Sequence, residues 1–410
     1  MTTMTDKQVD TLRELGQRYA RIAALECQQT TVDGWKRLNG LKDTRPMVRL
    51  DQLPWHELPW GEDDCICPSG LLRQTEAYLR RTLYAWEHFR ADMVVLPHIP
   101  LQKHLENALL GPEPRIENLG ISKRFGEQLT TMDEVLALET PIIRTDPEGD
   151  RRRMEMLGEI FDGIVPVVLT GLVRHSGLWD RITSLISPER LLYDLVDRPE
   201  YVAALIARFV EMEHGVLDQL EAAGALEAAP PEVHCTGGFC DELPSPNYES
   251  AGAEGAGAMA RDTWTFSMAQ MFSEVSPSMQ EEFDIVPLAP LLERYGLVYY
   301  GCCEPLHDKI DVVRRIRNVR KISVSPWADK ARAAERIHGD FVFSAKPNPA
   351  FLATSPFDAD LVRRDLEETV TICRRHDTPC ELILKDVSTV ANDPLRLDAW
   401  EAIAMEVVQA

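Results

Sequence analysis

The segment YYGCCEPLHDK (299–309) brings two adjacent cysteines, a glutamate and a histidine together within six positions, directly after the apolar run LVYYG. A further histidine lies near the end of the short stretch EVHC (232–235). Thiolate, imidazole and carboxylate groups are good zinc ligands, and a catalytic zinc keeps one position open for the substrate. The residue types therefore predict a zinc site in which the ion acts as a Lewis acid or activates a thiol. Its candidate ligands are His234, Cys302, Cys303 and Glu304.

Three other interpretations of the cysteine pair stay open at this point. A free cysteine at a strand end is commonly a small buried hydrophobic residue. A redox pair would need a disulfide between adjacent residues, which strains the backbone. A cysteine nucleophile would need a base, and His307 follows four or five residues further along the chain.

Polar residues also close other apolar stretches of the sequence. Lys385 and Asp386 end the run CELILKD, where a charged pair either is functional or forms a salt bridge between strand and loop. Lys346 lies in FSAKPNP, a turn fixed by two prolines and suited to hold a carboxylate or a phosphate. We predict that the catalytic residues are His307, Lys385 and Asp386. The predicted substrate-binding residues are Gln270, Glu274, Lys346 and Asn348.

The elements that must position these residues alternate between strands and helices. Eight short stretches are predicted strands: 93–97, 165–171, 232–235, 263–271, 297–301, 320–326, 340–347 and 380–386. Amphipathic helical patterns separate most of them, which is typical of parallel βαβ units. Eight such units predict an α/β fold, a (β/α)8 TIM barrel whose active site lies at the carboxyl ends of the strands. We expect the barrel over 91–410 and a helical N-terminal extension over 1–90.

Two segments suggest contacts with other molecules. The connection 236–262 is rich in Gly, Ala, Pro and Ser, and we interpret it as a lid, a docking loop for a partner or a plain surface insertion. The stretch LPWHELPW (53–60) predicts either a homodimer contact or a cap on the barrel bottom.

Composition and charge narrow the function classes. The formal net charge of -22 repels phosphates and anionic lipids, which argues against nucleic-acid and membrane partners. There is no apolar run of ~18 residues, the length that a membrane-spanning helix needs, and the first residues lack the pattern of a secretory signal. These features predict a cytoplasmic protein. Nine cysteines, an odd number, argue against a disulfide framework.

In the order of its motifs the chain resembles the uroporphyrinogen decarboxylase superfamily over about 190–408. The resemblance rests on SPERLLYDLVDRPEYVAALI, SEVSPSMQEEFDIVPLAPLLERYGLVYYGCCEP and ISVSPWADKARAAERIHGDFVFSAKPNPAFL. The superfamily includes zinc-dependent, corrinoid-linked methyltransferases, in which one strand carries His-x-Cys-Gly and the last strand often supplies another zinc-binding cysteine. Aligning Cys303 with the motif cysteine puts Gly301 at the motif histidine and Glu304 at the motif glycine. The last strand ends in Lys385-Asp386-Val387 instead of a cysteine.

The resemblance implies a methyltransferase that moves a methyl group between a small methylated compound or thiol and a corrinoid carried by a separate protein. Zinc would be its metal and the corrinoid its second cofactor. The alternative is a metal-free decarboxylase or lyase, in which Lys346 holds a substrate carboxylate while Asp386 or His307 moves a proton. A binding protein without catalytic activity is the third hypothesis, because fold alone does not decide function.

Overall fold

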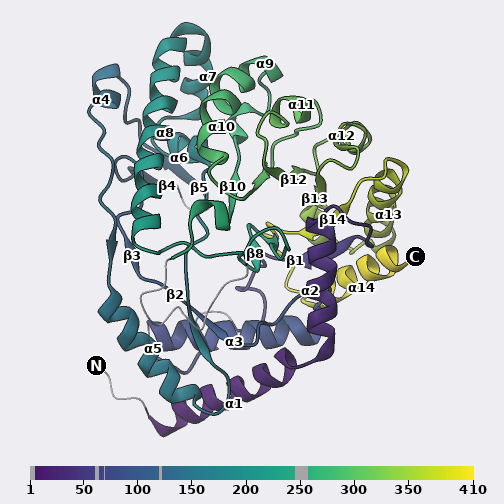
Figure 1. Ribbon diagram of the computed structural model, residues 1–410. Coiled ribbons are helices and arrows are strands. Elements are labelled where there is room, and N and C mark those ends of the chain that lie inside the picture. Colours follow the sequence, from purple (N-terminus) through teal and green to yellow (C-terminus); the bar gives the residue numbers. More distant parts are fainter. Residues whose placement is uncertain (1–4, 61–63, 69, 120–121, 245–256) are drawn as a thin grey trace.

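The computed structural model of the chain describes residues 5–60, 64–68, 70–119, 122–244 and 257–410. Part of the predicted loop 236–262, namely 245–256, therefore lies outside the described residues. The fold is mixed α/β with a mostly parallel central sheet, which confirms the predicted class at that level (Figure 1). None of the helices in the described ranges combines the length and the apolar character that a membrane crossing needs.

The central sheet has six parallel strands in the order β1-β14-β13-β12-β11-β10. These strands are β1 Met47–Leu50, β10 Trp264–Ser267, β11 Leu297–Tyr300, β12 Val319–Val324, β13 Val342–Ala345 and β14 Cys380–Leu384. A separate parallel pair is formed by β2 Ile99–Gln102 and β7 Val167–Thr170. The short antiparallel pairs are β3 Leu105–Glu106 with β6 Arg144–Thr145, β4 Ile116–Leu119 with β5 Ser122–Phe125, and β8 Glu232–Val233 with β9 Thr236–Gly237.

Single β-bridges lie in the segment that follows β7. Leu172 pairs in parallel with Leu226, and His175 pairs in parallel with Phe266 of β10. At the other edge the Asp92 amide donates to the Val48 carbonyl of β1 over 3.0 Å. His175 thus lies beside β10 and Asp92 beside β1, the two edge strands of the six-stranded sheet.

Two predictions about strands need correction. The stretch 93–97 forms no strand, and β2 begins only after Pro97, while Asp92 makes the contact with β1. Met47–Leu50 lies in the segment 1–90, where we expected a helical extension and no strand, yet it pairs along its whole length with β14. Its four residues stand between Pro46 and a loop rich in Pro and Trp, so they carry no separate strand signal.

Fourteen α-helices flank the strands in the described residues. They are α1 Asp6–Ala23, α2 Glu26–Asn39, α3 Leu71–His88, α4 Met132–Leu136, α5 Pro147–Phe161, α6 Leu178–Thr183, α7 Pro188–Asp197, α8 Pro199–Ala222, α9 Pro277–Gln280, α10 Val286–Leu292, α11 Ile310–Val313, α12 Lys330–Ile337, α13 Ala359–Arg375 and α14 Leu395–Gln409. Short 3-10 turns are η2 Ala260–Asp262, η3 Gln270–Phe272 and η5 Pro349–Leu352, and η4 Glu281–Ile285 is a π-helical turn. The Ser187 hydroxyl caps α7 and Pro188 follows at its first position, as the Ser-Pro pattern predicts.

The N-terminal helices form a second hydrophobic core beside the main one. In Figure 1, α1, α3 and α5 lie together on one side of the molecule. Their apolar residues, among them Tyr19, Leu79 and Phe161, pack with Ile99 and Leu101 of β2. α2 leaves this group, and its Trp35 packs with Met47, Val342 and Ile383 of the central sheet. The N-terminal segment thus contributes to the interior on which the site is built.

A substitution at Gly237 of β9 tests the packing of Trp35 against the sheet. A Cβ atom at Gly237 would lie 2.4 Å from the buried Trp35 ring. We expect Gly237→Ala to lower the free energy of unfolding by about 1–3 kcal/mol, because overpacking a filled core forces its neighbours to shift. Gly158→Ala in α5 is the matched control, since nothing described lies within 4 Å of its Cβ. Urea denaturation of both variants measures the difference, and equal stabilities would contradict the packing of Trp35 on β9.

Candidate functional site

A tight hairpin carries the predicted ligand His234 into the interior. Val233 of β8 pairs with Thr236 of β9, so His234 and Cys235 form a two-residue turn with φ values of 33° and 69°. Positive φ at both positions normally calls for Asn-Gly, and other residues are held there at a cost in strain. The Asn39 amide of α2 secures the hairpin by donating to the Gly237 carbonyl over 3.0 Å. The predicted strand 232–235 is therefore a hairpin whose tip bears the imidazole.

The His234 ring is fixed and uncharged. It stacks on Phe266 with the ring centroids 3.6 Å apart, and the edge of His175 meets it at 5.7 Å. Burial, with the positive charge of Lys385, lowers the pKa of His234 to about 2. The imidazole is therefore neutral, and one of its nitrogens accepts hydrogen bonds.

The two thiols lie directly beside this imidazole. Cys302 Sγ is 3.7 Å from His234 Nε2 and 3.6 Å from Cys303 Sγ. Gly301 precedes them with a φ of 94°, a conformation that suits glycine and turns the chain at the end of β11. Cys302 is buried, whereas Cys303 is exposed. The pair thus presents one sulfur to the interior and one to an incoming molecule.

Glu304 holds the thiol loop in place. Its Oε2 accepts from the Cys302 amide over 2.9 Å, and its Oε1 accepts from the Ala269 amide after β10 over 3.1 Å. Both carboxylate oxygens are therefore engaged by the backbone. We expected Glu304 to bind a metal, but the structure gives it the role of joining the loops that follow β10 and β11.

Lys385, at the end of β14, points its ammonium into the group of candidate ligands. Its Nζ is 3.1 Å from Cys302 Sγ, 3.4 Å from His234 Nε2 and 3.0 Å from Asp386 Oδ2. An ammonium has three N–H donors and no acceptor, so the three neighbours use all of them. Burial alone would lower the pKa of Lys385, but the Cys302 sulfur and the Asp386 carboxylate outweigh it and hold the pKa above its ordinary value.

This arrangement does not fit the predicted zinc ion. The Lys385 ammonium contacts the sulfur, the imidazole nitrogen and a carboxylate, which are the groups that would coordinate the metal. Glu304 is engaged elsewhere. Within the described ranges, no three His, Cys, Asp or Glu side chains form a group that could hold a metal ion.

The thiols differ in their acidity. The hydrogen bond from Cys302 to Cys303, followed by the positive charge of Lys385, outweighs burial and lowers the pKa of the Cys303 thiol. The same hydrogen bond, together with burial, raises the pKa of Cys302. The exposed sulfur is therefore the one that ionises first, and a thiolate is the nucleophilic form of cysteine.

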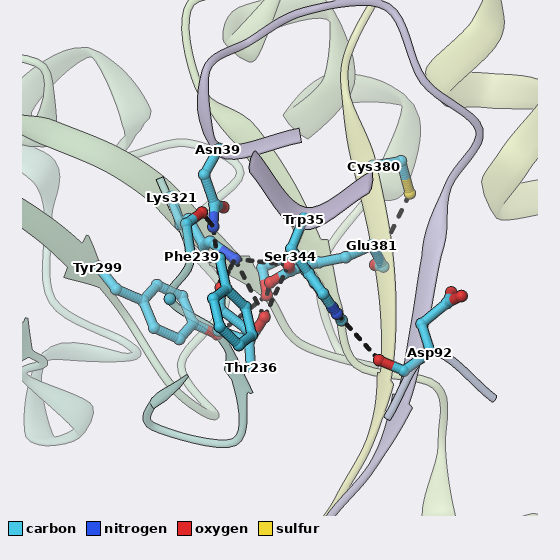
Figure 2. Close-up of polar contacts among 12 residues, drawn as sticks. Trp35, Asn39, Asp92, Thr236, Phe239, Tyr299, Lys321, Ser344, Cys380 and Glu381 are labelled. Carbon is cyan, nitrogen blue, oxygen red and sulfur yellow. Dashed lines mark hydrogen bonds and ion pairs between the residues drawn. The ribbon is translucent and has the colours of Figure 1, made fainter. Parts of the chain in front are cut away.

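Beneath the thiols a buried polar network crosses the sheet. Lys321 Nζ of β12 lies 2.7 Å from Glu381 Oε2 of β14, and both side chains are fully buried. Ser344 Oγ donates to Glu381 Oε1 over 2.5 Å, and Thr236 Oγ1 donates to Oε2 over 2.7 Å. Figure 2 shows these four side chains converging, with Tyr299 beside Ser344. Each oxygen of the buried carboxylate is thus satisfied.

Lys346 extends this network toward the carboxyl ends of the strands. Its Nζ donates to Ser344 Oγ over 2.5 Å and lies 5.2 Å from the centre of the Tyr299 ring. Burial lowers the pKa of Lys346 to about 8, against the opposing effect of Glu381. The predicted cation is therefore present at this end of the sheet.

The remaining predicted residues lie apart from the thiols or serve the fold. His307 Nε2 lies 3.6 Å from Asp308 Oδ2. Gln270 donates to Asp180 over 3.0 Å, and Glu274 is exposed. The Asn348 side chain accepts from the Ala350 amide and caps η5. The structure therefore brings together His234, Cys302, Cys303, Lys385 and Asp386 from the predicted set, with Lys346 nearby.

Sequence reasoning missed Phe266, Tyr299, Lys321, Ser344 and Glu381 as parts of the site. A signal was present for the charged pair, because RKISVSP and CELILKD each carry a charge inside an otherwise strand-like run. Buried charges in strands need partners, so a Lys and a Glu at such positions predict each other.

Comparison with known proteins gives little more. Neither a known protein family nor a curated protein matches the chain. Among solved structures, a methyltransferase from Methanosarcina mazei is 12% identical and matches with a TM-score of 0.48. The match covers 91% of this chain and 97% of that one. Since this likeness is too weak to support a conclusion about activity, the function has to be inferred from the site.

Proposed function

We propose that the chain is a methyltransferase in which the Cys303 thiolate accepts a methyl group from a small methylated compound. The observation that carries this proposal is the Lys385 ammonium, 3.1 Å from Cys302 Sγ, beside a sulfur pair with one exposed member. A buried positive charge favours the thiolate form and keeps it available at neutral pH. It supplies here the charge that a metal ion would otherwise provide to a thiol.

The transfer step follows from these roles. The Cys303 thiolate attacks the methyl carbon, the S–C bond forms, and the bond between the methyl group and the donor heteroatom breaks. The electron pair leaves with that heteroatom, which takes a proton from water. Cys302 donates its hydrogen bond to Cys303 before the attack, and Glu304 keeps the loop in position through the Cys302 amide.

A separate corrinoid protein is the proposed second partner of the reaction. This proposal rests on the motif order described above, as does membership of the uroporphyrinogen decarboxylase superfamily. The homodimer and the cytoplasmic location also stay predictions. A mixture of the methylated chain with a free corrinoid reduced to the Co(I) state, followed by the absorption spectrum of the corrinoid, tests whether the methyl group moves to the cobalt and leaves the Cys303 thiolate behind.

We further propose that the strands close into the barrel expected from the sequence. The backbone contact between Asp92 and Val48 and the bridges at Leu172 and His175 support this closure. In such a barrel the residues that follow β11, β13 and β14 would meet at the active-site end.

The decarboxylase or lyase has less support. His307 is paired with Asp308, and Asp386 is paired with Lys385. Both predicted proton carriers therefore already have a charged partner.

Selective labelling of cysteines tests the proposed function. We expect iodoacetamide at neutral pH to alkylate Cys303 several-fold faster than Cys27, because a lowered pKa leaves more of the Cys303 thiol in the reactive thiolate form. Cys27 is also free and exposed, and so serves as the internal control. Methyl iodide should likewise place one methyl group on the peptide that contains Cys303.

The variants separate the two sulfurs. Cys303→Ser should remove the fast phase of labelling, whereas Cys302→Ala should slow it, because the hydrogen bond to Cys303 is lost. Peptide mass spectrometry follows both residues in one sample. A rate at Cys303 no higher than at Cys27 would overturn the proposed function.

A further inference from the structure

Ser325, Lys346 and Lys385 follow the carboxyl ends of three neighbouring strands, and Ser325 and Lys346 stand level with each other. β12, β13 and β14 are adjacent and parallel. Val324 pairs with Ala345, and the Lys346 amide continues this ladder by donating to the Val324 carbonyl over 2.9 Å. Side chains alternate along a strand, so Ser325 and Lys346 share the inner face with Ser323 and Ser344. The two residues are therefore neighbours at the edge where parallel sheets bind ligands.

Ser325 has an unused hydroxyl. The residue is 1% exposed, and within the described part of the chain its Oγ has no hydrogen-bond partner. A buried polar atom without a partner is costly, and such atoms are rare in folded proteins. The orphan hydroxyl at this strand end therefore indicates a place for a polar ligand.

The ammonium of Lys346 has donor capacity left as well. Its hydrogen bonds in the described structure go to Ser344, to the hydroxyl over 2.5 Å and to the carbonyl over 3.3 Å. An ammonium has three donors, which leaves one for a ligand. The nearby carboxylate of Glu381 is already engaged by Lys321, Thr236 and Ser344.

Ser325 and Lys346 also lie close to the loop that carries Cys302 and Cys303. Ser323 Oγ, two residues before Ser325 on β12, donates to the Cys302 carbonyl over 2.8 Å. The positive charge of Lys346 contributes to the lowered pKa of His234. The Cys302 sulfur in turn opposes the lowering of the Lys346 pKa by burial. A small molecule held at Ser325 and Lys346 would therefore lie beside the sulfur pair.

We propose that Ser325 and Lys346 form a subsite for a carboxylate group, so that the methylated substrate is a small carboxylate. This inference rests on the proposed function and names its substrate class. One hydroxyl donor and one ammonium donor match the two oxygens of a planar carboxylate. A phosphate or sulfate has more oxygens to satisfy and would leave some of them without donors.

Two alkylating reagents of nearly equal size test this subsite without a known substrate. Iodoacetate carries a carboxylate and iodoacetamide a neutral amide. With both, the thiolate displaces iodide and forms an S–CH2 bond. The measured quantity is the rate with iodoacetate divided by the rate with iodoacetamide. We expect this ratio at Cys303 to exceed the ratio at Cys27 by about tenfold or more, the effect typical of charge-assisted hydrogen bonds.

Variants assign the preference to the two residues. Lys346→Gln should bring the ratio at Cys303 down to that at Cys27, and Ser325→Ala should lower it by about threefold. Ser325→Ala removes one oxygen atom, so it remains informative if Lys346→Gln does not fold. Lys42→Gln removes the same charge from a side chain that is 59% exposed, and should leave the ratio unchanged.

The outcomes distinguish the subsite from the function. Fast reaction with iodoacetamide and no preference for iodoacetate would overturn the subsite and leave the proposed function standing. Slow reaction with both reagents would overturn the proposed function itself. Acetate should compete with iodoacetate at Cys303 better than sulfate does, and stronger competition by sulfate would overturn the carboxylate as the ligand class.

Discussion

Replacement of Lys385 with methionine should slow the alkylation of Cys303 at pH 6.5 by about tenfold or more, because the positive charge of Lys385 helps, after the hydrogen bond from Cys302, to lower the pKa of the Cys303 thiol. The methionine keeps the length and the apolar stem of the side chain but removes the charge that lies 3.1 Å from Cys302 Sγ. Below its pKa a thiol reacts in proportion to its thiolate fraction. The loss of the ammonium therefore appears directly as a loss of rate.

The pH dependence of the alkylation rate should change in a defined direction. In the natural chain the pKa of Cys303 lies below its ordinary value, so the rate reaches its plateau at a lower pH than for an ordinary thiol. In Lys385→Met the midpoint should move to higher pH, and the rates of the two proteins should converge above both midpoints. Lys385→Arg keeps the charge and should retain most of the shift. A midpoint that stays in place in Lys385→Met would show that Lys385 does not activate the thiol.

Metal analysis also tests whether the Lys385 ammonium occupies the position predicted for the zinc ion. If the ammonium takes the position of the ion, protein purified without chelator should contain well under one zinc per chain. One zinc per chain, lost together with Cys303 in Cys303→Ser, would mean that Lys385 moves aside and that the zinc site predicted from the sequence, with ligands among His234, Cys302, Cys303 and Glu304, is correct. The thiol reactivity would then have to be assigned to the metal.

From the sequence, the location of the site in the fold could be predicted better than the contacts between its residues. Apolar runs followed by polar residues located Cys302, Cys303, Lys346 and Lys385 at strand ends, because parallel strands in βαβ units all end at one edge. The distances between them depend on strand order and register, which no local pattern records. The contact between Lys385 and Cys302 joins residues 83 positions apart in the chain.

His234 shows a second kind of limit. EVHC has the apolar residue and the length of a strand end, yet His234 and Cys235 form a turn with positive φ. Local preference argues against such a turn for these residues. Contacts from α2, such as the amide of Asn39 on Gly237, hold it in place. Tertiary packing therefore overrides the local signal at the residue that matters for the site.

The buried network that supports the site should be far more sensitive than any surface ion pair. We expect Glu381→Ala to lower the free energy of unfolding by about 3–5 kcal/mol, the usual cost of leaving one partner of a buried pair unpaired. Lys321 and Glu381 are both fully buried and 2.7 Å apart. Without the carboxylate, the Lys321 ammonium keeps only Thr236 and the Gly237 carbonyl as hydrogen-bond partners. Urea denaturation measures the change, with Glu155→Ala, from an exposed pair with Arg151, as the control.

A double variant shows whether charge or shape is responsible. Lys321→Met with Glu381→Leu removes both charges and keeps similar volumes, so it should recover most of the stability lost in Glu381→Ala. The loss of Glu381 should also affect Lys346, because Glu381 raises the pKa of Lys346. Without that carboxylate, Lys346 should lose its proton at lower pH, and the preference of Cys303 for iodoacetate should fade at lower pH as well. A double variant as unstable as Glu381→Ala would instead assign the cost to the hydrogen bonds from Ser344 and Thr236.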